Sequence, residues 1–475
     1  MKMKKLALIF VLGFIAVFFV ACGNDGENDP SAYQTGENGG EVTTDSNGTA
    51  SIEVTDIVIW TQSRHDLEFM QSLVDEINAD YDDINVILEV YTDNFPQIVE
   101  IAASTDSLPD ILTLLGAVPG ILLPRDALYP LDDLMPDGFL ERFDSELFVE
   151  GTNMNNGYIV SLPNTGNADR LVYNRDIFDR LGLSGPPQTL EQLVEYSRII
   201  TTELSNEGIF GFALPFQNPT NAFGRGATAI PQLSGYPVHN GFNFQTGEFD
   251  FGVYAPVMEA LQEIFTGGYA FPGSESLLID PIRTQFAEGN LGMYMVANHS
   301  EWGVFTEQFP TDVNWAYANL PTITGEVTGS VPLRAGAWWG ITRDSEDPEK
   351  AWRVLERFYA HENLVAYFEG GFGLAVNSTV IAAADDPESV QFSPMMAIQN
   401  TDQIWPHTPH NLTIQGDTWA DMFVEFVFGV RNDLDDIIEE LNERYNDALR
   451  EGIEHGTTET IQFSNFDPAN PANSQ

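Results

Sequence analysis

The sequence predicts an α/β protein with more than one domain-sized hydrophobic core. Residues 52–60 and 84–90 are rich in β-branched side chains, and residues 66–81 between them place apolar side chains on one helical face. Strand, helix and strand within about forty residues form a βαβ unit with an expected right-handed crossover. Residues 95–114 then repeat helix, turn and buried strand. About 420 residues follow the polar N-terminal region, which is enough for two or three cores.

Three later helices have clear sequence signals. Thr189 and Gln192 form a capping-box pair at the start of the first. Asp347 and the Pro348 that follows it begin the second. The third covers residues 433–452, and its acids are expected to face water. The expected buried stripes of the second and third helices are Ala351, Trp352, Leu355 and Phe358, and Leu434, Ile437, Ile438, Leu441, Tyr445, Ala448 and Leu449.

The start of the chain has the plan of an export signal. Three lysines precede the apolar run Leu6–Ala21, which is short for a membrane-spanning helix of ~20 residues. Val20-Ala21-Cys22 resembles the end of a bacterial lipoprotein signal, which implies that residues 1–21 are removed and that Cys22 carries the lipid. The alternatives are an ordinary cleaved signal and a short span. Cys22 is the one cysteine of the sequence, so no disulfide can form within the chain.

Two segments are predicted to lack a packed core. Residues 22–50 contain almost no apolar side chains, and their composition predicts a flexible tether. Residues 463–475 are predicted to form a disordered tail.

The charge of the chain excludes several partners. Acids outnumber Lys and Arg 71 to 20, the net charge is −51, and Lys350 is the one lysine outside the signal. Such a surface repels phosphate backbones and anionic headgroups, so nucleic-acid binding is not expected. An acidic exported chain with almost no lysine fits a saline or alkaline habitat, where salt screens the self-repulsion.

Several stretches appear in the order found in the extracellular solute-binding proteins of ABC importers, family 1, which the chain resembles from residue 56 to about residue 450. This family includes maltose-binding and oligosaccharide-binding lipoproteins. The matching stretches are DIVIWTQ, LPDILTL, LYPLDDL, GYIVSLPNTGNADRLVYNRDIFDRLGL followed by PPQTLEQLVE, FAEGNLGMYM, AWWGITRDSEDPEKAWRVLERF and the closing helix after FVFGVRND.

The resemblance implies an α/β, two-lobed periplasmic-binding-protein-like fold of the class II type, with the ligand cleft between the lobes. The first lobe would comprise residues 51–166 and 321–377, and the second residues 167–320 and 378–462. The chain would cross near residues 161–167, near Leu320 and after about Asn377. Such proteins capture a carbohydrate by closure and present it to a membrane permease, without a cofactor or metal. The resemblance further implies a non-enzymatic monomer anchored by lipid on the outer face of a Gram-positive cell membrane.

Carried over by position, the resemblance gives fourteen ligand-binding candidates: Gln62, Arg64, His65, Asn167, Asp169, Asn218, Asn221, Phe223, Trp302, Arg334, Trp338, Trp339, Trp405 and Trp419. Trp302 is the leading candidate because it aligns with an aromatic platform. A plain surface histidine is the alternative for His65, and packing is the alternative for Trp419. Neighbouring side chains in a strand face opposite ways, so one of Trp338 and Trp339 is expected to face the cleft.

Aromatic and polar groups together suit a sugar ligand. A pyranose face covering ~50 Å² of a tryptophan contributes about 1 kcal/mol, whereas micromolar binding needs about 8 kcal/mol. Several hydrogen bonds must therefore join two or three stacking contacts. Leu114 and Leu115 stand where maltose-binding relatives carry aromatic and charged contacts, which argues against maltodextrins in particular.

Other functions remain as alternatives. A secreted glycosidase would need two carboxylates in a recognised signature, and hydrolysis of an oligosaccharide would reveal it. The same fold could hold a polyamine or quaternary amine in an aromatic cage, and that binding would weaken as salt rises. A purely adhesive protein would not close on a ligand. His407 and His410 have a spacing seen in metal sites but lack a third ligand nearby, so no zinc is expected.

Overall fold

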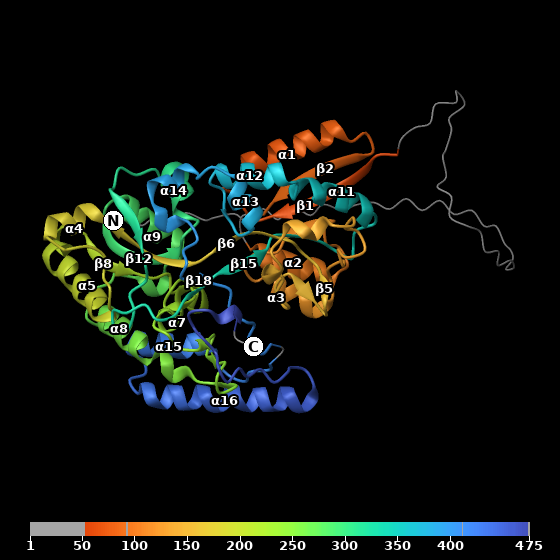
Figure 1. The fold of residues 1–475 in the computed structure, drawn as a ribbon. Helices are drawn as coiled ribbons and strands as arrows, with labels where there is room; N and C mark the ends of the chain where they lie inside the picture. Colours follow the sequence, from red (N-terminus) through yellow and green to blue (C-terminus); the bar gives the residue numbers. More distant parts are fainter. Residues whose placement is uncertain (1–52, 92–93, 411, 474–475) are drawn as a thin grey trace, which may run out of the picture. The chain divides into compact units, whose positions relative to one another are not determined.

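The computed structural model describes residues 53–91, 94–410 and 412–473, and these residues contain both lobes (Figure 1). The predicted export signal, the Cys22 lipid site and the tether all lie outside them. Among the described residues, the helices are too short or too polar to cross a membrane.

The first lobe is built on the βαβ unit that the sequence predicts. Strands β1 (Thr55–Thr61) and β2 (Ile84–Val90) are parallel and are linked by α1 (Leu67–Asp80). The sheet has the order β16-β3-β1-β2, with β3 (Ile111–Thr113) parallel to β1 and β16 (Trp339–Ile341) antiparallel to β3. Met70, Leu73, Val74 and Ile77 of α1 are buried, which is the helical face the periodicity predicts. Within the described residues, the other α-helices of this lobe include α2 (Phe95–Ser104), α3 (Val118–Leu122), α11 (Pro348–Phe358), α12 (His361–Glu369) and α13 (Ser378–Ala383).

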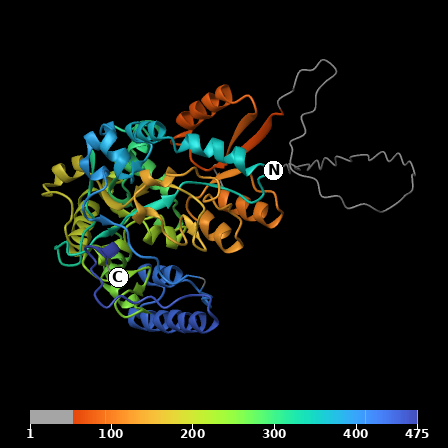
Figure 2. The same cartoon turned by 45° about the vertical axis from the view of Figure 1, so that its right-hand side comes forward.

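The second lobe has a four-stranded sheet in the order β13-β7-β12-β8. Its strands are β7 (Asp169–Asn174), β8 (Phe210–Ala213), β12 (Leu291–Ala297) and β13 (Trp315–Ala318). The larger helices packed around it are α4 (Arg175–Leu181), α5 (Leu190–Leu204), α8 (Ala255–Thr266), α9 (Ile279–Ala287), α15 (Trp419–Val427) and α16 (Leu434–His455). Figures 1 and 2 both show α16 along the outer edge of this lobe, beside α15.

The predicted helix starts are confirmed. The Thr189 side chain accepts a hydrogen bond from the Gln192 backbone N–H, and the Asp347 side chain accepts one from Lys350. The stripe Ala351, Trp352, Leu355 and Phe358 is buried. In α16 the residues Leu434, Ile437, Leu441, Ala448 and Leu449 are buried, while Ile438 and Tyr445 are half-buried.

Three short strands connect the lobes in the sheet order β15-β6-β17. They are β6 (Pro163–Asn167), β15 (Arg334–Ala337) and β17 (Leu374–Ala375), and Figure 1 shows β6 and β15 running between the lobes. The crossing placed near Leu320 from the sequence lies instead at β15. The residues after Leu320 stay with the second lobe, because the Leu190 N–H donates to Thr322 and the Ile323 N–H donates to Ser234.

The prediction of a disordered tail is wrong for residues 463–473. Phe466 is 3% exposed, and its ring stacks on Phe244 with centroids 4.8 Å apart. The Ser330 hydroxyl donates to the carbonyl of Pro468 at 2.6 Å. The aromatic residues near the C-terminus pack against the second lobe, and this burial outweighs the Asn- and Pro-rich composition that suggested disorder.

Candidate ligand-binding site

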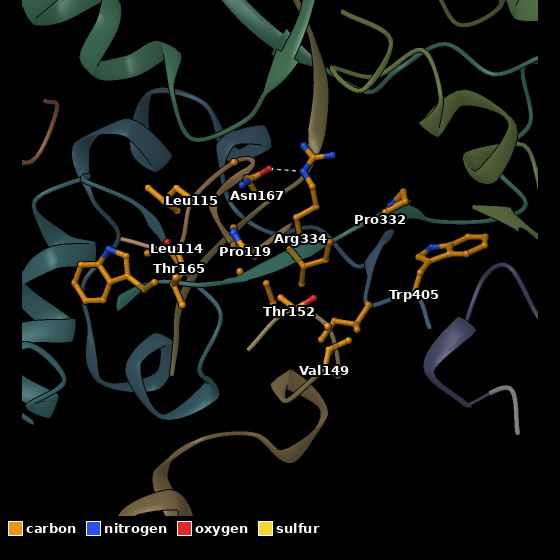
Figure 3. A pocket seen from close by; sticks show the side chains of 18 of the residues that line it. Leu114, Leu115, Pro119, Val149, Thr152, Thr165, Asn167, Pro332, Arg334 and Trp405 are labelled. Atoms are coloured by element: carbon orange, nitrogen blue, oxygen red, sulfur yellow. Dashed lines mark hydrogen bonds between the residues drawn. The ribbon is translucent and has the colours of Figure 1, made fainter. Parts of the chain in front are cut away.

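A cavity of about 720 Å³ lies between the lobes and is lined from both of them and from the connecting strands. This volume is within the range of small-molecule sites. Figure 3 shows Leu114, Leu115 and Pro119 on one side of Arg334, and Pro332 and Trp405 on the other. The cavity is therefore assembled from segments that lie far apart in the sequence.

The first lobe contributes the loops that follow its parallel strands. Ser63 and His65 come after β1, and Leu114 and Leu115 come directly after β3. The carboxyl ends of adjacent parallel strands meet at one edge of a sheet, where ligands of open α/β sheets commonly bind. The Gln62 amide donates to the Leu115 carbonyl at 3.4 Å, so one loop supports the other.

Arg334 and its partners form the polar floor of the site. Arg334 Nε donates to Asn167 Oδ1 at 2.8 Å, and its two terminal nitrogens donate to the Asp169 carboxylate at 2.9 and 2.6 Å. The Arg334 side chain is 43% exposed, whereas that of Asp169 is 2% exposed. The pairing of β15 with β6 places Arg334 opposite Asn167 (Figure 3). Two N–H groups of the guanidinium stay available to a ligand.

Histidines are concentrated at the cavity. Five of the seven in the sequence line it: His65, His239, His299, His407 and His410. His65 Nε2 lies 2.9 Å from the Phe372 carbonyl oxygen, and His239 Nδ1 lies 2.6 Å from the Gln232 amide nitrogen. The Nδ1 atom of His299 is buried and has no hydrogen-bond partner among the described residues.

Burial keeps two of these imidazoles neutral at pH 7. Burial, followed by the charge of Arg334, lowers the pKa of His239 to about 4. Burial also lowers the pKa of His299 to about 3, and the nearby charges of His65, Arg334, Arg283 and Arg225 act in the same direction. A neutral imidazole offers one donor and one acceptor, which suits a hydroxyl group.

Two tryptophans complete the lining. Trp338 lines the cavity and packs against Tyr367 with ring centroids 5.0 Å apart, while Trp339 packs against Phe358 in the first-lobe core. Of the two neighbours, Trp338 is among the residues that line the cavity and Trp339 is not. Trp405 donates through Nε1 to Ser330 Oγ at 3.0 Å, which fixes its ring beside Phe466.

The structure brings together only part of the predicted site. His65, Asn167, Arg334, Trp338 and Trp405 line the cavity. Gln62 and Asp169 stand behind them as hydrogen-bond partners. The other candidates are not among the lining residues: Arg64, Asn218, Asn221, Phe223, Trp302, Trp339 and Trp419.

The local packing explains where those residues lie. Phe223 is fully buried in the second-lobe core, and Trp419 packs against it with centroids 5.8 Å apart. Asn218 caps helix α6 (Pro219–Phe223) by accepting from the Asn221 N–H. Trp302 is half-buried against Phe392 at 5.3 Å. A direct ligand contact for these residues stays a prediction.

Arg64 lies at the rim, where it contacts the opposite lobe. Its guanidinium is 3.6 Å from the carboxylate of Asp280 in α9. Asp280 also accepts from Arg283 at 3.1 Å, and Arg283 is held by Glu301. The first lobe therefore contacts a charged network of the second at one edge of the cleft.

Sequence reasoning missed His239 and His299. Both carried a signal: His239 precedes Asn-Gly, a typical hairpin turn, and His299 follows the end of β12 by two residues. Loops at strand ends are where binding residues gather. Among the described residues, no three His, Cys, Asp or Glu side chains form a group able to hold a metal ion.

Comparison with known proteins gives the family. Residues 61–363 match the model of the bacterial extracellular solute-binding protein family, which is more than half of the chain. The sn-glycerol-3-phosphate-binding periplasmic protein UgpB of Pectobacterium atrosepticum is 28% identical over 175 residues, which cover 34% of this chain and 38% of that protein. The chain thus spans less than two fifths of the length of this relative.

Solved structures share the fold. One, from work on xylan utilization by Caldanaerobius polysaccharolyticus, has a TM-score of 0.66 at 18% identity and covers 82% of this chain and 100% of that one. A sugar transporter from Bacillus licheniformis in complex with stachyose has a TM-score of 0.60 at 14% identity, with 83% and 100% covered. The two-lobed arrangement is common to such proteins, and the family match covers parts of both lobes and the connecting strands β6 and β15. The chain belongs to the bacterial extracellular solute-binding protein family.

Proposed function

We propose that the protein captures a carbohydrate, in particular an oligosaccharide, in the cleft and delivers it to the permease of an ABC importer. The observation that carries this proposal is the cavity between the lobes, where aromatic rings and hydrogen-bonding groups converge. Trp338 and Trp405 supply ring faces or edges, and Arg334 and Asn167 supply polar groups. Sugars need both kinds of contact, because one stacked ring contributes only about 1 kcal/mol.

The relatives support the same class of ligand. The similar sugar transporter from Bacillus licheniformis was solved in complex with stachyose, and RafE, another structural neighbour, was solved in complex with raffinose. The curated relative is a binding protein for sn-glycerol 3-phosphate. Stachyose and raffinose are hydroxyl-rich and uncharged, and neutral imidazole and amide groups recognise such ligands by donating and accepting hydrogen bonds. sn-Glycerol 3-phosphate carries hydroxyl groups and an anionic phosphate.

The two lobes suit a capture mechanism. A ligand that contacts both walls binds the closed form more tightly than the open form, and this difference shifts the population toward closure. A permease that recognises the closed form would then receive loaded protein. We expect no catalysis of the bound sugar, and incubation with oligosaccharides followed by chromatography tests for hydrolysis.

Membrane attachment is part of the proposal. Cys22, directly after the apolar run, would become the lipid-modified first residue, and the polar segment after it would tether the lobes to the outer face of a Gram-positive cell membrane. Metabolic labelling with a palmitate analogue should mark the protein, and Cys22→Ser should abolish the label. We expect the exported protein to be a monomer.

A thermal-shift screen of mono- and oligosaccharides, followed by calorimetry, tests the binding proposal. The double variant Arg334→Gln with Asp169→Asn keeps the pair neutral and removes its charge-assisted hydrogen bonds, so affinity should fall about tenfold or more. The matched control is Arg343→Gln with Asp126→Asn, an exposed pair outside the cavity lining. The control should bind as the wild type does. Stabilisation by polyamines or quaternary amines alone would refute carbohydrate binding.

A further inference from the structure

The charge of the cavity lining differs from that of the chain. Acids outnumber Lys and Arg 71 to 20 in the sequence. Among the described residues that line the cavity, Glu150 is the one acid, whereas Arg334 and five histidines are present. A cleft that binds uncharged sugars would gain nothing from excluding carboxylates, since carboxylates accept hydrogen bonds well from sugar hydroxyls. The lining is therefore much poorer in negative charge than the chain as a whole.

The two carboxylates at or behind the lining already have donors. Glu150 accepts from the backbone N–H groups of Asn156 and Gly157, at 2.6 and 3.2 Å. Asp169 accepts from Arg334 through both of its oxygens. The carboxylate oxygens near the cavity thus already accept hydrogen bonds from within the protein. The groups left for a ligand are predominantly donors.

The donor groups left for a ligand include the Arg334 guanidinium and the imidazoles of His239 and His299. The guanidinium keeps two free N–H groups after its bonds to Asn167 and Asp169. His239 and His299 line the same cavity as Arg334, and the Arg334 charge lowers the pKa of each imidazole. The Nδ1 atom of His299 is buried without a partner among the described residues. An unpaired polar atom in such a position is costly unless a ligand or a water satisfies it.

We infer that the cleft binds an acidic carbohydrate, one that carries a carboxylate or a phosphate, and that its anionic group lies beside Arg334, His239 and His299. This inference rests on the proposed function, because it specifies the class of sugar. An anion supplies several acceptor oxygens to a site that is rich in donors, and Arg334 can contact it with two N–H groups. The negative surface elsewhere would repel such a ligand, so recognition depends on the cleft alone.

Binding of an anion should be linked to proton uptake. The groups around His299 are His65, Arg225, Arg283 and Arg334, with Asp169, Glu301 and Glu150 as the acids of this region. In the free protein the pKa of His299 is about 3 and that of His239 is about 4. A bound anion stabilises the protonated imidazole and raises these pKa values. Affinity for an acidic sugar should therefore rise as pH falls from the raised pKa values of the complex toward the free-state values of about 4 and about 3.

The decisive experiment compares matched ligands by calorimetry at pH 7. The probes are digalacturonic acid against its neutral dimethyl ester, and glucose 6-phosphate against glucose. We expect the acidic member of at least one pair to bind about tenfold more tightly, the difference between a charge-assisted and a neutral hydrogen bond. The carboxylate and phosphate pairs distinguish the two sources of charge. At pH 5, titration in buffers of different ionisation enthalpy should show proton uptake for digalacturonic acid and none for its dimethyl ester.

Single variants test the residues. His239→Gln and His299→Gln keep a polar side chain but cannot become cationic, so at pH 5 each should reduce the preference for the acidic probe and remove part of its rise at low pH. His455→Gln at the exposed end of α16 is the control and should change neither. An unchanged preference in both cleft variants would overturn the assignment to these histidines.

The outcomes separate this inference from the proposed function. If a neutral sugar binds as tightly as its acidic partner, or more tightly, the inference fails and carbohydrate capture stands. If neither member of any pair nor any other sugar binds, both fail. Tighter binding of the acidic member, lost in the histidine variants, supports both.

Discussion

Arg170 holds the residues beside the polar floor of the cleft. Its side chain and that of Asp402 are 0% exposed, and their bidentate contacts are 3.0 and 2.5 Å long. Arg170 also donates to the backbone carbonyls of Asp169 and Met395. One buried guanidinium therefore ties β7 to β18 (Asp402–Gln403) and to the segment before it. It fixes the position of Asp169, on which Arg334 depends.

Removing one partner of the Arg170–Asp402 pair should lower the free energy of unfolding far more than removing both partners. Arg170→Met leaves the Asp402 carboxylate buried without its counter-charge, so the free energy of unfolding should fall by about 3–5 kcal/mol. The double variant Arg170→Met with Asp402→Leu should lose clearly less of its free energy of unfolding than Arg170→Met alone. Urea unfolding followed by circular dichroism measures both. Arg180→Gln breaks an exposed pair and should leave the free energy of unfolding nearly unchanged; an equally small effect of Arg170→Met would contradict this account.

Three of the eight polar candidates and two of the six aromatic candidates from the sequence line the cavity. Arg334 and Asn167 follow from their places in the family pattern, and both line the cavity. Phe223 of α6 and Trp339 of β16 are instead buried in the cores, because a large ring gains more from dry packing than from an open cleft. His239 and His299 were missed because neither residue belongs to any of the stretches that resemble the family.

The connecting strand β6 shows how an element constrains the site. Gly166 lies between β15 and β17, and a Cβ at this position would lie 2.5 Å from Val376 Cγ1 and 3.1 Å from the Arg334 carbonyl oxygen. There is no room for a methyl group. The close approach of three strands brings Asn167 and Arg334 into contact.

Gly166→Ala should therefore push the connecting strands apart. We expect a loss of about 1–3 kcal/mol in the free energy of unfolding, the usual cost of overpacking, together with weaker ligand binding. Gly336→Ala in the neighbouring strand β15 is the matched control, since its Cβ would meet nothing within 4 Å. Thermal unfolding of both variants is the measurement. A loss of stability in Gly336→Ala as large as in Gly166→Ala would show that the steric explanation is wrong.

Element types were predictable because apolar periodicity and caps are local properties. The βαβ unit and the helix starts at Thr189 and Asp347 follow from a few neighbouring residues. The route of the chain between the lobes cannot be predicted from neighbouring residues, because the residues after Leu320 are held by distant partners such as Ser234. The ordered C-terminal segment depends in the same way on Phe244, which lies more than two hundred residues earlier.

At the scale of the whole molecule, the site exists only where the lobes meet. The cavity draws on residues from Ser63 to His410, so no single segment of sequence contains it. Arg64 of the first lobe and Asp280 of the second are already 3.6 Å apart at one edge. This exposed pair is worth little by itself. Closure must therefore be stabilised mainly by a ligand that contacts both walls.

Small-angle X-ray scattering with and without saturating ligand tests the central claim of capture between two lobes most directly. The ligand is the sugar that stabilises the protein most in the thermal-shift screen, and saturation is verified by calorimetry on the same sample. Capture between two lobes predicts that the radius of gyration decreases on binding, and that the double variant of Arg334 and Asp169 needs about tenfold more sugar, or still more, for the same decrease. An unchanged radius of gyration for the fully loaded wild-type protein would contradict it.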